Sequence, residues 1–292
     1  YYSDDATLIG NTVSGNLTAN DCGGVCFNAS DNAVLMGNAI VSNTTHGGFY
    51  GNNGIGLLFW HSCNVSLTRN VILNNKGREG NPGDYWGGGV CIDRYSTITL
   101  TENIISANGA TRGGGLYAAS SAVVVLNGNI IADNTAQDYY DSSGRGSGLY
   151  LGGDATLTNN IIADNQADTA GSGLYINSSS PRLLHTTIAR NTGGDGVGVY
   201  VAGTASRVAL TNTILVSHAV GITVTDGNMA TLQATLWGKG EDWSGIGTLV
   251  TDTVSVWGDP VFVDPDAGDY HIGPGSAATD RGVSTTVNTD MD

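Results

Sequence analysis

Aromatic, acidic and basic side chains concentrate in three segments of the first half of the chain. These segments are residues 44–53, 76–86 and 135–145. Aromatic rings beside charged groups suit saccharide binding, because a ring covers the apolar face of a sugar while charged groups bond its hydroxyls. Residues shortly after the first two segments share this character. We therefore predict a binding site that includes Trp60, Tyr85, Trp86, Asp93 and Arg94.

The same residue types could support catalysis on a polysaccharide. A lyase needs a base at the sugar ring and a cation or Ca²⁺ that neutralises the uronate. Side chains that could serve are His61, Lys76, Arg78 and Arg94. A hydrolase needs two carboxylates about 5–10 Å apart, for which Asp84 and Asp93 are one conceivable pair. No spacing here matches a catalytic motif, so the catalytic residues stay unassigned, and an alternative is that these segments are solvated loops packed by their own aromatic rings.

A repeated phrase determines which elements position these residues. The phrase is Asn, any residue, an aliphatic, two residues and Asn. Its clearest copies start at Asn11, Asn38, Asn70, Asn103, Asn129 and Asn160. Copies of one phrase that recur at such a roughly constant spacing indicate a solenoid, in which each repeat forms one coil stacked on the next. We predict that the asparagines face inward, bond the asparagine of the next coil and satisfy the backbone at the bend.

Two further elements complete each repeat. One is a Gly-x-Gly strand such as Gly146–Tyr150, and the other is an alternating strand such as Thr97–Leu100. Three short strands per repeat, without a helical pattern between them, predict an all-β solenoid of about nine coils. We expect the coils to fill residues 1–257. Residues 258–292 are expected to close the domain.

The two phrases resemble those of bacterial secreted and surface proteins with right-handed parallel β-helix repeats. The Asn-x-Ile and Gly-Gly-Gly-Leu-Tyr phrases are similar to those of polymorphic outer-membrane proteins, and the tail from Gly258 to Ser276 resembles a closing segment. The resemblance implies a right-handed parallel β-helix. This architecture, which pectate-lyase-like enzymes share, hosts lyases, epimerases, hydrolases, adhesins and tailspikes, so it implies no single function.

Alternation along the Gly-x-Gly strands separates inward from outward side chains. Aliphatic residues two apart face the core, so the residue between them is expected to face solvent. In four consecutive coils that residue is a tyrosine, and the rings should lie about 4.8 Å apart. This tyrosine ladder consists of Tyr117, Tyr150, Tyr175 and Tyr200. It either stabilises the sheet or forms an exposed aromatic strip that binds sugar rings or another protein.

Composition narrows the partners. The net charge of −15 argues against nucleic acid, and no run of 18 apolar residues could span a membrane. The cysteines lack the spacing of a zinc site, so no metal is predicted there. Calcium is conceivable at Asp264–Asp269, but a capping turn fits that segment better. No cofactor is otherwise expected.

The four cysteines fall in the first third of the chain. They are Cys22, Cys26, Cys63 and Cys91. An even number fits disulfides in an oxidising compartment, and free buried thiols are the alternative. Cys26 and Cys91 share a column but are two coils, about 9–10 Å, apart, which is too far for a disulfide. A partner of Cys26 would therefore be Cys22 or Cys63.

These observations favour an extracellular or cell-surface structural or binding module. It could be an adhesin, a filament subunit or a rod that contacts carbohydrate, with a polysaccharide or another protein surface as its partner. Because the first coil begins near Tyr1, its edge is expected to be open, which would permit head-to-tail assembly. Trp237, Trp243 and Trp257 are expected to cover the other end of the core. The alternative is a polysaccharide-active enzyme, a uronate lyase or glycoside hydrolase, with its cleft beside the three aromatic segments.

Overall fold

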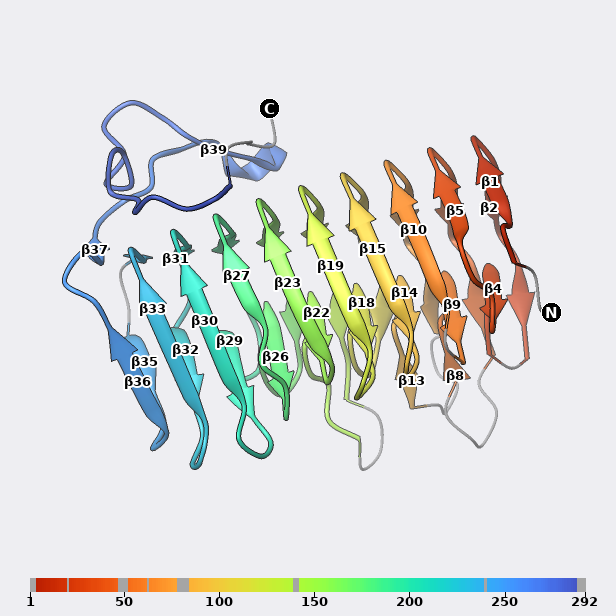
Figure 1. Ribbon diagram of the computed structural model, residues 1–292, viewed down its shortest axis with the longest axis horizontal. Helices are drawn as coiled ribbons and strands as arrows, with labels where there is room; N and C mark the ends of the chain where they lie inside the picture. The colour runs from red at the N-terminus through yellow and green to blue at the C-terminus, as the bar shows by residue number, and fades with distance from the viewer. Residues whose placement is uncertain are drawn as a thin grey trace.

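The computed structural model describes residues 4–19, 21–46, 52–61, 63–77, 84–138, 142–238 and 241–287. Within these ranges the chain winds through the same sheets once per coil, and each strand pairs in parallel with its equivalents in the neighbouring coils. The result is a right-handed parallel β-helix, drawn as a rod in Figure 1. The predicted all-β fold is confirmed.

Two long sheets form two sides of the rod. In order along the axis, sheet A contains β1 (Thr7–Ile9), β5 (Ala33–Met36), β10 (Asn64–Thr68), β15 (Thr97–Thr101), β19 (Val123–Asn127), β23 (Asp154–Thr158), β27 (Arg182–Leu184), β30 (Arg207–Thr211), β33 (Met229–Gln233) and β36 (Thr248–Thr251). Sheet B contains β2 (Thr12–Ser14), β6 (Ala39–Val41), β11 (Val71–Leu73), β16 (Ile104–Ser106), β20 (Ile130–Ala132), β24 (Ile161–Ala163), β28 (Thr187–Ala189), β31 (Ile214–Val216), β34 (Leu236–Trp237) and β37 (Val256–Trp257).

The Gly-x-Gly strands form the third side. Sheet D contains β4 (Val25–Asn28), β9 (Leu57–Trp60), β14 (Val90–Ile92), β18 (Leu116–Ala118), β22 (Leu149–Leu151), β26 (Leu174–Asn177), β29 (Val197–Ala202), β32 (Val220–Val224) and β35 (Glu241–Ser244). Among the described residues it has nine strands, as predicted, whereas sheets A and B have ten each. The extra strands arise because the chain passes once more through sheets A and B, as β36 and β37, after the last strand of sheet D.

Short strands fill the corner between sheets B and D. Sheet C contains β3 (Leu17–Thr18), β7 (Thr44–Thr45), β12 (Lys76–Gly77), β17 (Gly109–Ala110), β21 (Thr135–Ala136) and β25 (Gln166–Ala167), and a separate pair consists of β8 (Asn52–Asn53) and β13 (Tyr85–Trp86). The three aromatic segments leave the rod here. Residues 47–51, 78–83 and 139–141 of those segments lie outside the described residues.

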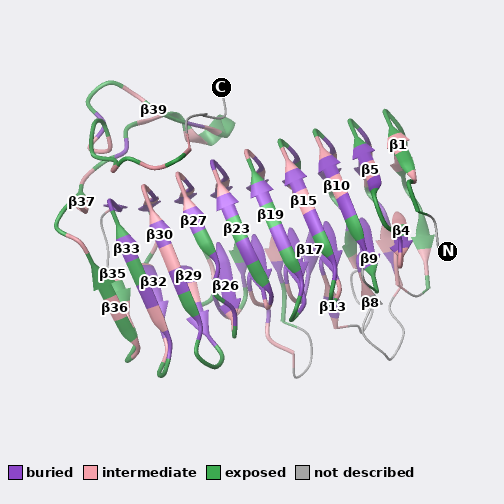
Figure 2. Ribbon diagram, viewed as in Figure 1, coloured by how far each residue is buried: buried purple, intermediate pink, exposed green. Residues whose placement is uncertain are grey.

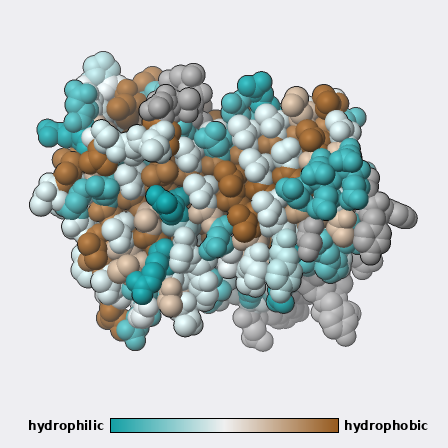
Figure 3. Space-filling model, viewed as in Figure 1, coloured by the Kyte–Doolittle hydropathy of each residue, from teal (hydrophilic) through white to brown (hydrophobic). Residues whose placement is uncertain are grey.

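Aliphatic side chains from all three long sheets fill the interior. Examples are Leu100 of sheet A, Ile105 of sheet B and Leu116 of sheet D, which are fully buried. Figure 2 shows buried and more exposed residues alternating along the strands. The outward positions of sheet A carry small or β-branched residues such as Thr99 and Val125, so this face is largely pale or brown in Figure 3.

Two asparagine ladders brace the inside of the bends, as predicted. Asn134 Nδ2 donates to Asn165 Oδ1 at 3.0 Å and to the Ile105 carbonyl at 2.9 Å. Its own Oδ1 accepts from the backbone N–H and side-chain amide of Asn108. The left-handed residue at such a bend is the one before the ladder asparagine, for example Asp133 with φ 57°. Inward orientation, rather than tolerance of left-handed φ, therefore explains the repeated asparagine.

The Gly-x-Gly phrase provides space for these ladders. A Cβ on Gly148 would lie 2.5 Å from the Gly173 carbonyl oxygen and 3.1 Å from Asn165 Nδ2. Any larger residue would push the next coil or the ladder out of place. The glycine of one repeated phrase and the asparagine of the other thus form the two sides of the same contact.

The chain leaves the stacked coils after Trp257 and folds back along the rod (Figure 1). This tail contains β38 (Phe262–Asp264), the 3₁₀ helix η1 (Pro265–Ala267) and β39 (Asp269–Ile272). Its Tyr270 is buried in a cluster with outward residues of sheet B, among them Ala163 and Val216. The expectation that the tail caps the last coil is therefore wrong. It covers an apolar outer face of sheet B instead.

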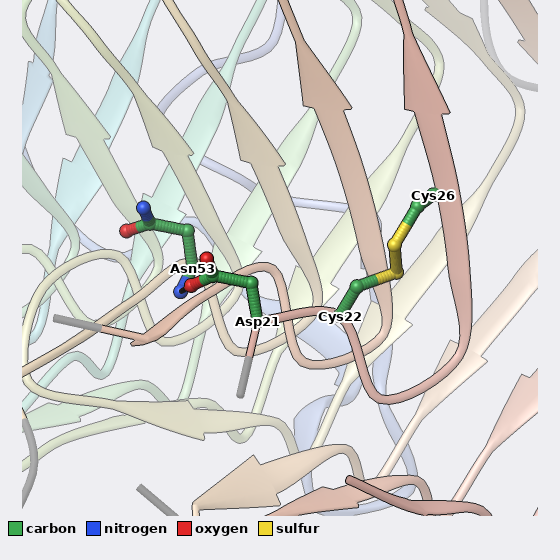
Figure 4. Close-up of a disulfide and its surroundings, with 4 residues drawn as sticks. All are labelled: Asp21, Cys22, Cys26 and Asn53. Atoms are coloured by element: carbon green, nitrogen blue, oxygen red, sulfur yellow. Dashed lines mark hydrogen bonds between the residues drawn. A yellow bond between two sulfur atoms is a disulfide. The ribbon is translucent and has the colours of Figure 1, made fainter. Parts of the chain in front are cut away.

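The cysteines divide into one disulfide and two thiols. Cys22 is bonded to Cys26, next to the bond from the Asn53 N–H to the Asp21 carboxylate (Figure 4). Cys63 and Cys91 are free and buried. Leu58 separates Cys26 from Cys91 in the sheet, as expected. Both sequence interpretations, a disulfide and free thiols, thus hold for different cysteines.

Candidate functional site

A groove of about 360 Å³ lies where sheet D turns into sheet A, on the coils of β14 and β18. The lining residues are His61, Trp86, Asp93, Arg94, Tyr95, Tyr117, Ala119 and Ser120. Four of the predicted site residues therefore meet here, namely Trp86, Asp93, Arg94 and Tyr117. Trp60 contacts the groove through His61, on which its ring stacks.

The groove exists because side-chain size changes abruptly along one corner. Trp60, Asp93, Ala119 and Gly152 follow equivalent core residues of β9, β14, β18 and β22, so they occupy one column. The first two are bulky and the last two are small. The early coils thus form a wall, and the next two coils, with Ala119 and Gly152, form a low floor that ends at Asn177.

The wall carries three rings. Trp60 and His61 stack with centroids 4.9 Å apart and an interplanar angle of 20°, and His61 Nδ1 lies 3.1 Å from Asn28 Oδ1. Tyr95 adopts φ 63° and leaves 70% of its surface exposed. A left-handed conformation costs a non-glycine residue about 1–2 kcal/mol. An exposed aromatic at such a position gains no packing that would offset this cost.

Two charged groups of opposite sign border the groove. Asp93 is half-buried and Arg94 is exposed. Neither forms an ion pair with any residue in the described parts of the chain. Both are therefore available to a ligand, Asp93 as an acceptor for hydroxyl groups and Arg94 as a donor to hydroxyl or carboxylate oxygens.

The tyrosine ladder has the predicted register, since Tyr117, Tyr150, Tyr175 and Tyr200 pair in adjacent strands. Consecutive rings stack with centroids 5.0, 5.2 and 5.3 Å apart. Trp86 adds a fifth ring, 5.2 Å from Tyr117. Sequence reasoning placed Trp86 in a loop and gave no sign of this stacking.

The prediction that the ladder is an exposed strip is wrong. Only 9% of Tyr117, 7% of Tyr150 and 6% of Tyr175 is exposed, and Tyr200 is half-buried. Stacked rings cover each other's faces, and neighbours cover their edges, such as Arg145, whose guanidinium lies 5.3 Å from the Tyr175 ring centroid. The outward Leu58 and Cys91 are buried in the same cluster. The ladder therefore stabilises sheet D and offers no ring face to a ligand.

Burial also sets the protonation of the ladder. The pKa of Tyr117 is raised well above its usual range, first by burial and then by the neighbouring Cys91 and Tyr150. Burial likewise raises the pKa of the Cys91 thiol. Both groups are neutral at physiological pH, so neither acts as a base or a thiolate nucleophile beside the groove.

Other predicted residues lie elsewhere. Tyr85 is buried against Ile55 and Ala110 in a small satellite core, so its prediction as a binding residue is wrong. Asp84 faces Arg112 at 3.8 Å and does not line the groove with Asp93. The supposed carboxylate pair is therefore not brought together there. Arg78 lies outside the described residues.

The described residues hold no cluster of three or more histidine, cysteine or acidic side chains that could bind a metal. In the tail segment considered for calcium, Asp264 caps η1 and Asp266 bonds Arg190 at 2.7 Å. Asp269 accepts from the His271 N–H at 3.0 Å. These carboxylates have protein partners. Separately, none of the described helices is long and apolar enough to cross a membrane.

Sequence reasoning missed Tyr95, Ala119 and Ser120. A signal was present, because Asp93-Arg94-Tyr95 occupies a corner where the next coils have Ala119-Ser120 and Gly152-Gly153. Aligning the corners after each Gly-x-Gly strand would have revealed the change in size. The repeated phrases include the strands and the asparagine bends but not these corners.

Comparison with known proteins agrees with the architecture. Residues 56–235 match the family model for the right handed beta helix region. No curated protein sequence matches the chain significantly. Two solved structures are similar at low scores. The A-module of the Azotobacter vinelandii mannuronan C-5 epimerase AlgE6 shares 11% identity, covering 88% of this chain and 84% of its own, with a TM-score of 0.34. The TibC-catalyzed hyper-glycosylated TibA55-350 fragment shares 17%, covering 88% and 99%, with a TM-score of 0.26.

Proposed function

The chain belongs to the right-handed beta helix family, and from this premise we propose that it is an extracellular carbohydrate-binding module whose ligand occupies the corner groove. The observation that supports this is the groove itself, which combines exposed rings with a carboxylate and a guanidinium that form no ion pair among the described residues. Ligand sites typically join apolar or aromatic walls to a few polar groups. This groove has that composition.

The shape of the groove favours a polymer. The wall of His61 and Tyr95 offers ring faces for a sugar, and beyond the floor residue Ala119 the small Gly152 of the next coil leaves room for a neighbouring sugar. Asp93 would accept bonds from hydroxyls and Arg94 would donate to ring or carboxylate oxygens. A binding site open at one end accommodates a chain better than a small molecule.

Different observations support an extracellular or cell-surface location. The Cys22–Cys26 disulfide fits an oxidising compartment. The net charge of −15 favours solubility and disfavours contact with anionic membranes or nucleic acid. Both features suit a module that contacts polysaccharide outside the cytosol.

Binding to a panel of soluble polysaccharides, neutral and uronate-containing, tests the proposal. Affinity electrophoresis or calorimetry should detect a ligand for the wild type. We expect Tyr95→Ala and Arg94→Ala each to weaken binding at least about tenfold, because each removes a ligand-facing group. Arg69→Ala is the matched control, since it breaks only the surface pair with Glu102 at another corner. Equal binding by Tyr95→Ala, Arg94→Ala and the wild type would refute the groove assignment.

A polysaccharide-active enzyme is the second candidate. One observation favours it, namely that His61, Asp93 and Tyr95, all capable of proton transfer, line one groove. Release of reducing ends, or the ultraviolet absorbance of an unsaturated sugar, would reveal turnover of a bound polymer. Turnover that disappears in Asp93→Asn while binding persists would favour the enzyme over the binding module.

A further inference from the structure

A second group of aromatic residues lies at the last two coils, far from the groove. Three of the five tryptophans line one pocket of about 270 Å³ there. They are Trp237 of β34, Trp243 of β35 and Trp257 of β37. Further lining residues are Asp242, Leu249, Thr251, Asp252 and Ser255.

The register explains how the pocket arises. Trp243 pairs with Ile222, and Trp257 pairs with Trp237, so both rings occupy positions that face the core in earlier coils. The chain then turns away at Gly258 and folds back over sheet B. The described tail therefore does not cover these core-facing positions, and the pocket lies at the end of the core, beside Trp237.

Shielding of the core accounts for only one of the three rings. Trp237 is 2% exposed and closes the interior, whereas Trp243 and Trp257 are 44% and 64% exposed. In the described part of the chain, none of the three stacks on another ring. Exposing two indoles forfeits much of their burial energy. Free ring faces around a cavity are the features of an aromatic binding site.

Hydrogen bonds fix this arrangement. Trp257 Nε1 donates to Asp242 Oδ2, which orients the indole. Asp252 accepts from the backbone and hydroxyl of Ser255 and from the Ala234 N–H, which holds the pocket floor. Burial alone would raise the pKa of Asp252, but the hydrogen bonds from Ser255, Ala234 and Val254 together lower the pKa further than burial raises it, so the carboxyl stays ionised at neutral pH. The Thr251 hydroxyl has no described partner and can bond a ligand.

We propose that this pocket is a second saccharide site that binds a neutral pyranose, such as the end of an oligosaccharide. Indole faces pack against the C–H faces of a pyranose, and Thr251 and Asp242 can bond its hydroxyls. No basic residue lines the pocket among the described residues, and two carboxylates would repel a uronate. The corner groove, by contrast, contains Arg94. The volume lies below the usual range for larger ligands, which favours a single ring.

Tryptophan fluorescence tests this inference with methyl glucoside, methyl galactoside, methyl mannoside and N-acetylglucosamine as neutral probes. Galacturonate is the anionic comparison. We expect saturable fluorescence changes with at least one neutral sugar. The affinity for that sugar should be at least tenfold weaker in Trp257→Ala and in Trp243→Ala. Trp257→Phe should bind more tightly than Trp257→Ala because it keeps a ring face. Arg69→Ala is the matched surface control, and circular dichroism verifies the fold of each variant.

Three outcomes would overturn the proposal. They are the absence of binding for every neutral probe, galacturonate binding as tightly as the neutral sugars, and Trp257→Ala binding like the wild type. If sedimentation shows self-association that Trp257→Ala abolishes without any sugar binding, the pocket is a protein docking site instead. If Tyr95→Ala binds polysaccharide like the wild type, only the groove proposal is refuted. The two proposals are therefore tested independently.

Discussion

At the residue scale, His218 is an exception within an otherwise uniform ladder. It lies one coil beyond Asn191, where the next asparagine would be, and Asn191 Nδ2 donates to its Nε2 at 3.2 Å. The neutral ring therefore carries its proton on Nδ1, which is buried and has no partner among the described residues. Burial lowers the pKa of His218 to about 4 from 6.5. The folded state thus favours the neutral imidazole.

This pKa shift predicts acid sensitivity. A depressed folded pKa means that the unfolded chain binds the proton first as the pH falls, so this contribution to stability is complete above pH 6.5 and declines toward pH 4. Between pH 7.5 and 4.5 the loss should be about 2.5 kcal/mol. His218→Asn would continue the ladder without a titrating group, and urea unfolding at both pH values should show a smaller acid loss by roughly that amount. Equal acid losses in the two proteins would contradict the assignment.

At the element scale, the asparagine ladders link successive coils from Asn11 to Asn191. Substituting Asn134 by alanine would remove the acceptor of the Asn108 backbone N–H and the side-chain donor to the Ile105 carbonyl, both in the interior. The Asn108 amide would keep its bond to the Ile72 carbonyl, and Asn165 Oδ1 would keep its bond from the backbone N–H of residue 134. Each unsatisfied buried group costs about 1–3 kcal/mol. We therefore expect a loss of about 3 kcal/mol or more, centred on β20 and β24, because a solenoid transmits stability mainly between neighbours.

Hydrogen exchange of the backbone amides measures this effect coil by coil. Asn16→Ala is the matched control, because Asn16 belongs to the same ladder but is exposed. It should cost less than about 1 kcal/mol. If the amides of β20 exchange as slowly in Asn134→Ala as in the wild type, the ladder is a consequence of coil stacking and does not stabilise it.

The elements also show what the sequence could and could not reveal. Strand order, inward asparagines and the register of Tyr117 with Tyr150 follow from periodicity, which fixes direction across a strand. Burial does not follow, because it depends on what lies beside the ring. Ring stacking and Arg145 enclose Tyr175, and no repeat pattern encodes that contact. The groove was half-predicted for the same reason, since its wall is aromatic but its floor is defined by small residues.

At the scale of the whole molecule, the tail determines which apolar surface is covered. The outward residues of sheet B are aliphatic along much of the rod, including Val71 and Ile104 in the early coils. From β24 onward, Tyr270 and Phe262 of the tail cover this face. A closing segment could be recognised from the sequence, but its destination could not, because the outward residues of sheet B occupy variable positions of the asparagine phrase, which the repeat does not constrain.

Polar contacts hold the tail at several points. Asn212 exchanges two bonds with the backbone of Val283, at 2.8 Å each, and His185 Nε2 lies 2.7 Å from the Thr285 hydroxyl. Arg190 bonds both Asp164, at 2.8 Å, and Asp266, at 2.7 Å. The Tyr270 hydroxyl donates to the second oxygen of Asp164. The Arg190 contacts are partly exposed and worth at most about 1 kcal/mol each, so burial of the Tyr270 ring should dominate.

Tyr270→Ala should therefore release the tail while leaving the coils intact. Removing a buried aromatic costs about 3–5 kcal/mol, which is more than the two Arg190 ion pairs supply together. Limited proteolysis should then cut within residues 258–287 much faster than in the wild type, and a hydrophobic dye should bind the uncovered face of β28 and β31. Arg190→Ala should have a smaller effect in both assays, because it leaves the ring in place. If Tyr270→Ala instead melts β28 and β31 together with the tail, the tail is part of the cooperative unit that the last coils need in order to fold.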